Sequence, residues 1–243
     1  MSTTEWLSRT ELLLGRDTVK KLADARVLVA GLGGVGAYAA ELICRAGVGR
    51  MTIVDGDNVD ATNRNRQLLA LRSNEGHAKA EVMAKRLKDI NPDAEITAID
   101  EFIKDERMEE ILSEPYDYVL DGIDTLSPKV AFAKICMRNK LKLVSSMGAG
   151  GKLDPGQIQV ADIEKSYNCK LARAMRKRLH RAGITTGFKV VFSPELVREE
   201  AVLRLNEEEE IQKSVVGTIS YMPPIFGCMC ASVVIRDLAE EPQ

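Results

Sequence analysis

Short apolar runs alternate with helix-forming segments along the first part of the chain. The run 26–30 is rich in β-branched residues and stops at glycine, and the run 51–54 ends at Asp55. The segment 79–90 places Val82, Leu87 and Ile90 on one helical stripe. The predicted strands are 26–30, 51–54, 95–99, 118–120 and 141–145, and the predicted helices are 16–25, 37–46, 79–90, 107–112 and 128–139. This alternation favours a mostly parallel sheet that is covered on both faces.

The pattern changes from residue 148 onward. The strand-like segments 157–162 and 188–192 are not separated by the same helix-strand rhythm, so they predict a β-rich extension of the sheet. The acidic run 207–210 is expected to be a solvated loop. We therefore predict an α/β fold of the Rossmann-like, doubly wound type in a single domain. Its predicted parts are a nucleotide-binding core over 1–147 and a substrate-side extension over 148–243.

Composition narrows the class of protein. The chain has 243 residues, 45% of them hydrophobic, and a formal net charge of −2, so any nucleic-acid partner would need a local basic patch. Five sparsely placed cysteines without a signal peptide indicate reduced thiols and a cytoplasmic location. The apolar stretch 222–235 contains prolines and is shorter than the roughly 20 residues of a membrane helix, so no membrane span is expected.

A glycine loop follows the first predicted strand. Gly31, Gly33 and Gly36 have the spacing of a dinucleotide-binding fingerprint, in which glycines permit a tight turn, close phosphate approach and helix packing. The following helix would point its free N–H groups at an anion. With Asp55 and Asp57 after the next strand, the loop predicts a bound nucleotide.

Three features favour a triphosphate over NAD as that nucleotide. Gly34 adds an extra glycine to the loop, and the segment 57–67 is unusually polar and cationic. Arg66 and Lys79 supply the positive charge that a triphosphate needs. Asp124 follows a predicted strand, where a carboxylate can share Mg²⁺ with phosphate oxygens.

Together these motifs resemble the ubiquitin-activating-enzyme-like (ThiF/MoeB/HesA-type) superfamily, whose members adenylate a carboxylate with ATP. The resemblance rests on the glycine loop, the segment 55–67, Lys79 and Asp124. It implies roles for individual residues in this sequence. The implied roles are ribose binding for Asp57, phosphate binding for Asn63, Arg66 and Lys79, magnesium association for Asp124, and contact with the ATP of a neighbouring subunit for Arg9. The role of Arg9 implies a homodimer.

The C-terminal half is similar to the tRNA threonylcarbamoyladenosine dehydratase branch of that superfamily. The segments that carry this similarity are 148–151, 154–159, 192–195 and 221–227. The branch implies adenylation of the threonylcarbamoyl carboxylate on a tRNA adenosine, followed by ring closure with release of AMP. The enzyme would mainly position groups and exclude water, because the nucleophile belongs to the same substrate molecule.

Several features leave alternatives open. The segment 165–181 holds seven cations and predicts either a tRNA-binding surface or a solvated basic helix, in which Arg173, Lys177 and Arg181 would share one face. The carbonyls of 148–151 are candidates for a monovalent cation, for substrate approach or for a plain turn. No cysteine is expected to be catalytic. The cysteines at 44 and 136 should pack in the core, those at 228 and 230 should be buried, and the one at 169 lies beside the basic segment.

Other functions remain as alternatives to the dehydratase. An enzyme that adenylates a ubiquitin-like sulfur carrier usually has two Cys-x-x-Cys pairs for zinc; this chain has none, so no zinc is expected. A non-catalytic nucleotide-binding scaffold would not need Arg66, Lys79 and Asp124 together. An NAD oxidoreductase is the most distant alternative, and a sulfur-transfer protein is a further candidate partner.

Overall fold

A computed structural model describes residues 5–205 and 213–240. The strands are β1 (Arg26–Ala30), β2 (Arg50–Val54), β3 (Glu95–Ile99), β4 (Tyr118–Asp121), β5 (Leu143–Ser146), β6 (Gln159–Asp162), β7 (Lys189–Phe192), β8 (Val202–Leu205) and β9 (Lys213–Val216). The α-helices are α1 (Ser8–Leu14), α2 (Arg16–Asp24), α3 (Gly36–Arg45), α4 (Lys79–Ile90), α5 (Asp105–Leu112), α6 (Leu126–Arg138), α7 (Lys170–His180) and α8 (Met222–Ala239). Short 3-10 helices are η1 (Glu5–Leu7), η2 (Ala61–Asn63), η3 (Arg72–Asn74), η4 (Pro155–Gln157), η5 (Ile163–Lys165) and η6 (Glu199–Ala201).

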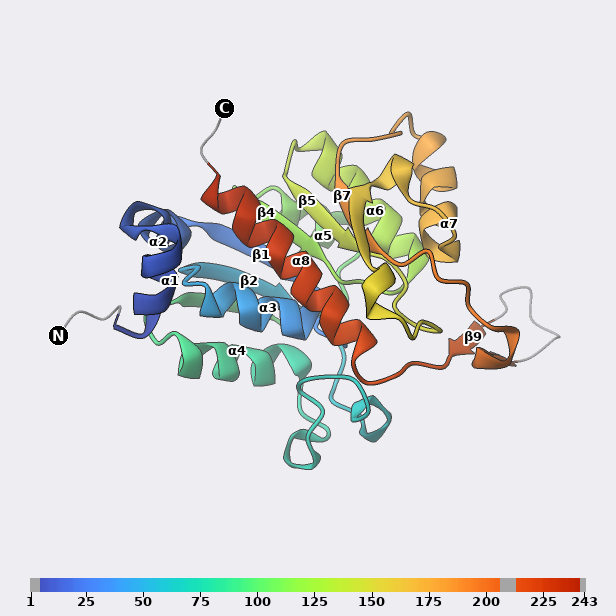
Figure 1. Cartoon of the computed structure of the whole chain (residues 1–243), viewed down its shortest axis with the longest axis horizontal. Coiled ribbons are helices and arrows are strands. Elements are labelled where there is room, and N and C mark those ends of the chain that lie inside the picture. Colours follow the sequence, from blue (N-terminus) through green and yellow to red (C-terminus); the bar gives the residue numbers. More distant parts are fainter. Residues whose placement is uncertain (1–4, 206–212, 241–243) are drawn as a thin grey trace.

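Seven strands form one sheet in the order β3-β2-β1-β4-β5-β7-β6 (Figure 1). Every neighbouring pair is parallel except β6 with β7, and Val29 of β1 lies between Ile53 of β2 and Leu120 of β4. The order runs outward in both directions from β1, which confirms the predicted doubly wound α/β fold. The predicted strands and helices are all present, with ends displaced by no more than two residues.

Helices cover both faces of the sheet and enclose two separate cores. α3, α4 and α8 lie in front of the sheet in Figure 1, while α5 and α6 lie behind it. Side chains of β1 alternate between the two cores, with Val27 and Val29 in the first and Leu28 and Ala30 in the second. All four are at most 1% exposed. A strand that is buried on both faces reads as a continuous apolar run, as the sequence does here.

The apolar stretch near the C-terminus forms the 18-residue helix α8, which is longer than the sequence pattern indicated. Pro223 and Pro224 lie in its first turn, where proline is compatible with a helix, so they do not interrupt it. Within the described ranges, α8 is the one helix long and apolar enough to cross a membrane by length and composition alone. Phe226 and Val234 are fully buried, so packing accounts for its apolar composition.

The second half of the chain continues the same sheet. β7 pairs with β5, and β6 adds an antiparallel edge, so the predicted β-rich extension is present. β8 and β9 form a separate two-stranded sheet, which lies at the right of Figure 1. The acidic run 207–210 lies outside the described residues.

Candidate nucleotide site

A cavity of about 480 Å³ opens at the carboxyl ends of β1, β2, β3 and β4. The two directions of the sheet diverge at β1 and β4, and loops that leave such a point on opposite faces create a crevice. The residues that line it include Gly31, Gly33, Asp55, Asp57, Gln67, Lys79, Phe102, Gly122, Asp124, Thr125 and Ser127. Six of these lining residues were predicted from the sequence. They come from four separate segments of the chain and are Gly31, Gly33, Asp55, Asp57, Lys79 and Asp124.

The glycine loop after β1 has the steric features that its spacing predicts. Gly31 has a φ of +87°, and a Cβ atom there would lie 2.8 Å from the backbone of Gly122. A Cβ atom on Gly36 would lie 1.7 Å from the Gly31 carbonyl oxygen, so only glycine allows α3 to begin there. Gly33 lines the cavity, and Gln67 Nε2 is the nearest heavy atom to its virtual Cβ, at 3.7 Å. A ligand can therefore approach the backbone closely at Gly33.

Gly34 faces a different neighbour. A Cβ atom on Gly34 would lie 2.9 Å from Cβ of Pro223, at the start of α8, and Gly34 does not line the cavity. The extra glycine in the loop is therefore explained by the close approach of α8. Its predicted nucleotide contact remains a prediction.

Asp55 fixes the glycine loop from the next strand. Its Oδ2 atom accepts a hydrogen bond from the Leu32 amide at 2.5 Å, and its Oδ1 atom accepts one from the Asp57 amide at 2.9 Å. Burial raises the pKa of Asp55, and the two backbone donors and Lys79 partly oppose that shift. Asp55 thus shapes the cavity, while Asp57 presents a carboxylate that is about half exposed.

Lys79 lies at the start of α4 and is buried against the cavity wall, with 4% of its surface exposed. Its Nζ atom donates to Asp57 Oδ2 at 3.0 Å, and its amide donates to the Asp57 carbonyl at 3.0 Å. The two residues close the base of the long loop 57–79. Asp57 therefore fixes the direction of a cation that lines the nucleotide cavity.

Asn63 and Arg66 lie on that loop and not among the cavity-lining residues. The Arg66 guanidinium donates to the Thr62 carbonyl at 3.1 Å and to Asn65 Oδ1 at 2.8 Å. The Asn63 carbonyl accepts the amides of Arg66 and Gln67 and forms a turn. The structure thus brings Lys79 to the cavity but keeps Asn63 and Arg66 beside it.

Asp124 lies in the loop after β4 and lines the cavity with an exposed side chain. Its Oδ1 atom accepts a hydrogen bond from Thr125 Oγ1 at 3.1 Å. No group of three or more His, Cys, Asp or Glu side chains in the described ranges could hold a metal ion by itself. A magnesium ion that accompanies phosphates needs only one or two carboxylates, so Asp124 fits that ion.

Some residues of the cavity belong to no sequence motif and were not predicted. Phe102 lines the cavity from the segment after β3 with 71% of its surface exposed, and Ser127 lines it from the start of α6. What Phe102 and Ser127 share in the sequence is that each follows a strand, β3 or β4, whose carboxyl end lies at the cavity. Gln67 could have been found as the neighbour of Arg66.

Arg9 lies on α1 and is not among the residues that line the cavity. It is exposed on α1, and the preceding Leu7 packs against Gly47, just before β2 and at the opposite edge of the sheet. The structure therefore does not bring Arg9 to the nucleotide cavity of its own chain. Its predicted contact with a neighbouring subunit remains a prediction.

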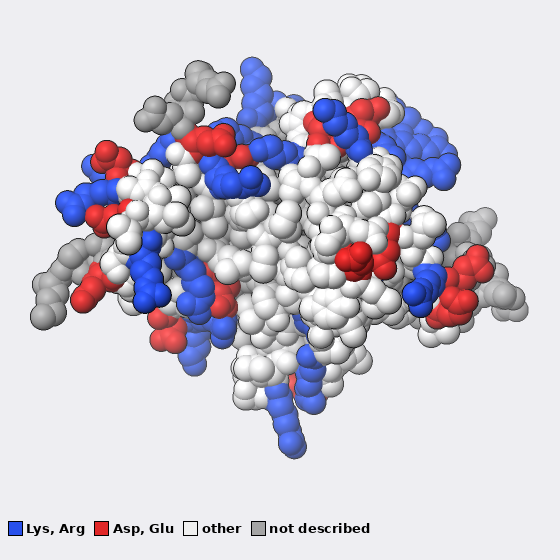
Figure 2. Space-filling model, in the orientation of Figure 1, with Lys and Arg blue, Asp and Glu red and all other residues white. Residues whose placement is uncertain are grey.

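The basic segment contains the helix α7, whose outer face is cationic. Lys170, Arg173 and Lys177 are exposed on it, and Arg181 follows its last turn, also exposed. Figure 2 shows blue side chains gathered over α7 at the upper right of this face. The predicted helical face is thus confirmed for Arg173 and Lys177.

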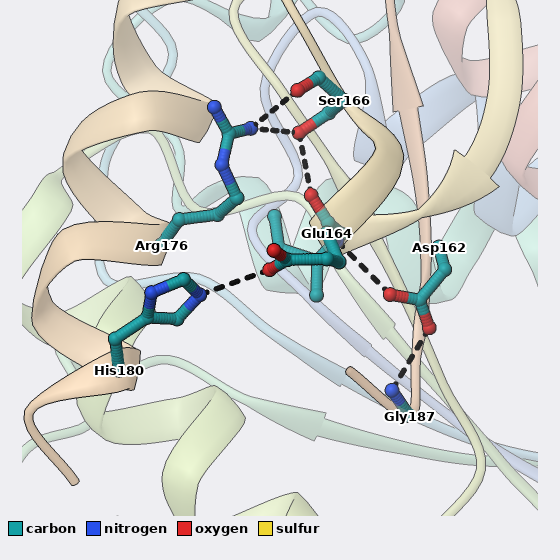
Figure 3. Close-up of polar contacts among 7 residues, drawn as sticks. Asp162, Glu164, Ser166, Arg176, His180 and Gly187 are labelled. Atoms are coloured by element: carbon teal, nitrogen blue, oxygen red, sulfur yellow. Dashed lines mark hydrogen bonds and ion pairs between the residues drawn. The ribbon is translucent and has the colours of Figure 1, made fainter. Parts of the chain in front are cut away.

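The inner side of α7 is tied to the segment before it (Figure 3). Arg176 donates to the Ser166 carbonyl at 2.7 Å and to the Ser166 hydroxyl. His180 Nε2 lies 2.9 Å from Glu164 Oε2, and the Arg178 guanidinium reaches the cavity-lining Ser127. The contact of Arg178 with Ser127 links the basic helix to the cavity, while the other contacts hold it against the segment 164–166.

The cysteines lie away from the cavity lining. Cys44, Cys136, Cys169 and Cys230 are buried, but Cys228 is exposed on α8, so the prediction that it is buried was wrong. The apolar run that contains Cys228 forms a helix with one outer face, and that face includes residue 228. Burial raises the pKa of Cys44 to about 11 and that of Cys230 to about 12, so both stay protonated near neutral pH.

Comparison with known proteins agrees with this site. The ThiF family matches residues 7–243. A tRNA threonylcarbamoyladenosine dehydratase of Bacillus subtilis is 39% identical over 240 residues, which cover 96% of this chain and 94% of the relative. The enzyme of that name from Escherichia coli is 46% identical over 170 residues, which cover 70% of this chain and 63% of the relative. The crystal structure of the E. coli enzyme TcdA in complex with ATP has a TM-score of 0.88 and 37% identity, with 97% of this chain and 94% of that chain covered.

Proposed function

Since this chain belongs to the ThiF family, we propose that it is an ATP-dependent tRNA threonylcarbamoyladenosine dehydratase. The observation that carries this proposal is the similarity to the B. subtilis dehydratase along nearly the whole of both chains. The cavity supports it, because it presents the glycine loop, Lys79 and Asp124 to one space. The ATP-bound relative has the same fold over nearly the whole chain.

In this proposal ATP lies along the crevice at the carboxyl ends of the strands. Asp57 binds the ribose, and the backbone at Gly33 and the start of α3 face the phosphates, where free N–H groups and the helix dipole favour negative charge. Lys79 lines the same cavity and supplies positive charge. Arg66 reaches the phosphates only after leaving its contacts with Thr62 and Asn65.

Magnesium fits the same arrangement through Asp124. The carboxylate of Asp124 would hold the ion together with phosphate oxygens, and the ion would neutralise charge on the departing pyrophosphate. Thr125 donates to Asp124 and so restricts the rotation of its carboxylate. Two other acids of the cavity already have partners, since Asp55 accepts a hydrogen bond from the glycine loop and Asp57 pairs with Lys79.

The enzyme then mainly has to position the threonylcarbamoyl group against ATP and to keep water away from the acyl adenylate. The threonylcarbamoyl carboxylate attacks the α-phosphorus of ATP, the bond to pyrophosphate breaks, and an acyl adenylate forms. Another group of the same modification attacks the activated carbonyl, AMP leaves, and a ring closes with the net loss of one water. Both steps use a nucleophile that the substrate itself carries, so orientation supplies most of the rate gain.

The remaining partners follow from the same proposal. Arg9 would complete the phosphate site of a second subunit, so we propose a homodimer. The loop 148–151 would offer carbonyls to a monovalent cation or approach the substrate. A sulfur-transfer protein is a candidate partner, and a cytoplasmic location would suit an enzyme that acts on tRNA.

The basic face of α7 is proposed as a tRNA-binding surface. The double variant R173A/K177A is expected to weaken tRNA binding and to reduce the slope of log K against log salt by roughly two, one for each lost phosphate contact. The KM for ATP should stay the same, since neither residue lines the cavity. Filter binding of tRNA across a salt series measures the slope.

A matched control removes two exposed lysines elsewhere. K20A/K85A takes the same charge from α2 and α4 and should leave the salt slope unchanged. Equal loss of tRNA binding in both double variants would contradict a tRNA surface on α7.

The proposed function itself is tested by measuring the mass of the modified tRNA nucleoside before and after the reaction. The chain is incubated with ATP, Mg²⁺ and tRNA that carries threonylcarbamoyladenosine, and the modified nucleoside should lose the mass of one water while AMP and pyrophosphate are released. A small ubiquitin-like carrier protein serves as the competing substrate. Turnover with that protein and none with the tRNA would instead favour a sulfur-carrier adenylyltransferase.

A further inference from the structure

A fully buried ion pair lies beneath the cavity wall at the end of β4. Lys129 Nζ, from the second turn of α6, lies 2.9 Å from Asp121 Oδ2, and both side chains are 0% exposed. Neither residue lines the cavity, so neither meets the nucleotide directly.

The pair holds the backbone of Ile123 from both sides. Lys129 Nζ donates to the Ile123 carbonyl at 2.8 Å, and Asp121 Oδ1 accepts the Ile123 amide at 3.0 Å. Ser145 Oγ donates to Asp121 Oδ2 at 2.6 Å and fixes that carboxylate from β5. The peptide groups on both sides of Ile123 therefore have charged partners, and such hydrogen bonds are about twice as strong as neutral ones.

Ile123 immediately precedes Asp124, and the residue before it is anchored as well. The Gly122 amide donates to the Ala30 carbonyl at 2.7 Å, at the point where β1 enters the glycine loop. The segment 122–124 is thus fixed to β1 on one side and to the ion pair on the other. Its free end carries the Asp124 carboxylate toward the cavity.

Stability alone does not account for this arrangement. A buried ion pair pays a large desolvation cost, and well-packed apolar residues in its place are often as stable or more stable. What apolar residues could not provide is the pair of hydrogen bonds to the backbone at Ile123. The pair thus serves the geometry of the 122–124 segment.

We propose that Lys129 is a positioning residue that, together with Asp121, sets the place of Asp124 for the magnesium ion that accompanies ATP. The inference rests on the proposed ATP site. It requires neither tRNA nor dehydration for its test.

The neutral double variant D121N/K129M removes both charges together and so avoids an unpaired buried charge. ATP affinity is measured by calorimetry with and without Mg²⁺. We expect the gain in affinity that Mg²⁺ provides to fall roughly tenfold, as is typical when a partner of a metal-binding side chain is lost. The affinity for ATP alone should change less than about twofold, and amide hydrogen exchange over 122–124 should become faster.

The variant Y118F is the matched control. Tyr118 begins the same strand, is 2% exposed, and donates its hydroxyl to Asp237 Oδ2 at 2.8 Å at the opposite edge of the sheet. It loses a buried polar contact without touching the 122–124 segment, so it should keep the full magnesium gain. An equal loss in Y118F, or a wild-type gain and wild-type exchange in D121N/K129M, would overturn the proposal.

A milder variant covers the case in which D121N/K129M does not fold. S145A removes one hydrogen bond to Asp121 and leaves the charges in place. It should reduce the magnesium gain about threefold, since one charge-assisted bond of several is lost. If S145A binds ATP with the full magnesium gain, the positioning role is rejected. If the chain binds ATP and magnesium as expected but does not act on tRNA, the proposed function fails and this inference stands.

Discussion

ATP turnover is expected to fall by roughly 10²- to 10³-fold in Lys79→Ala, the loss typical when one donor to developing charge is removed from an enclosed site. Lys79 is the cation that both lines the cavity and is buried at its wall. Its ammonium therefore acts in a medium of lower dielectric than water, where its attraction for phosphate is strong. Single-turnover release of pyrophosphate measures the effect directly.

The loss of turnover in Lys79→Ala should result from the missing ammonium group and not from a disturbed helix α4. Lys85→Ala removes a lysine from the exposed side of α4 and should leave turnover unchanged. Lys79→Ala also frees Asp57 of its partner, but that carboxylate is about half exposed and can be hydrated, so the free energy of unfolding should change little. Wild-type turnover in Lys79→Ala would mean that the phosphates do not lie at this wall.

Replacement of Asp124 by alanine is the second variant with a large expected effect. Turnover should fall by roughly 10²- to 10³-fold, because the pyrophosphate would leave without an oriented counter-charge. Asp124 is exposed, and its side chain makes one hydrogen bond, to Thr125, so the fold should tolerate the change. The measurement is turnover across a magnesium titration, together with the thermal midpoint.

Two further variants separate charge from shape at this position. Asp124→Asn keeps the acceptor for Thr125 but removes the charge, and it should be almost as slow as the alanine variant. Asp93→Ala removes an exposed carboxylate after α4 and should be as active as the wild type. If Asp124→Asn keeps full turnover at low magnesium, Asp124 does not bind the ion.

The sequence could predict the fold and the glycine loop because both leave a local signal, the first in the apolar periodicity of the elements and the second in the spacing of the glycines. A strand buried on both faces must be continuously apolar, and this requirement predicted the ends of β1 to the residue; the alternation of 95–99 did the same for the exposed edge strand β3. Gly31 is required by its positive φ, and Gly36 is required because its Cα lies against the Gly31 carbonyl. The spacing of these glycines could therefore be recognised in the sequence alone. The family resemblance added ATP and the dehydratase reaction.

The local sequence pattern did not predict where a side chain points when several partners are within its reach. Arg66 and Lys79 are both cations near one nucleotide loop, but Lys79 turns to the cavity while Arg66 turns back to Thr62 and Asn65. Cys228 and Cys230 share one apolar run, but the rotation of α8 exposes the first and buries the second. Such choices depend on what packs opposite, which periodicity does not record.

The order of strands and helices along the chain, the glycine loop at the end of β1 and the acid that follows β4 could all be predicted from the sequence. Those features can be recognised within short stretches of the chain, because they depend on the apolar periodicity of each element and on the steric limits of the glycine turn. The pairing of Lys129 with Asp121 beneath Asp124 is visible only in the folded chain, and so is the cavity that Phe102 and Ser127 line together. Their contacts join separate strands and helices, and a buried charge is stable only where the fold supplies its partner.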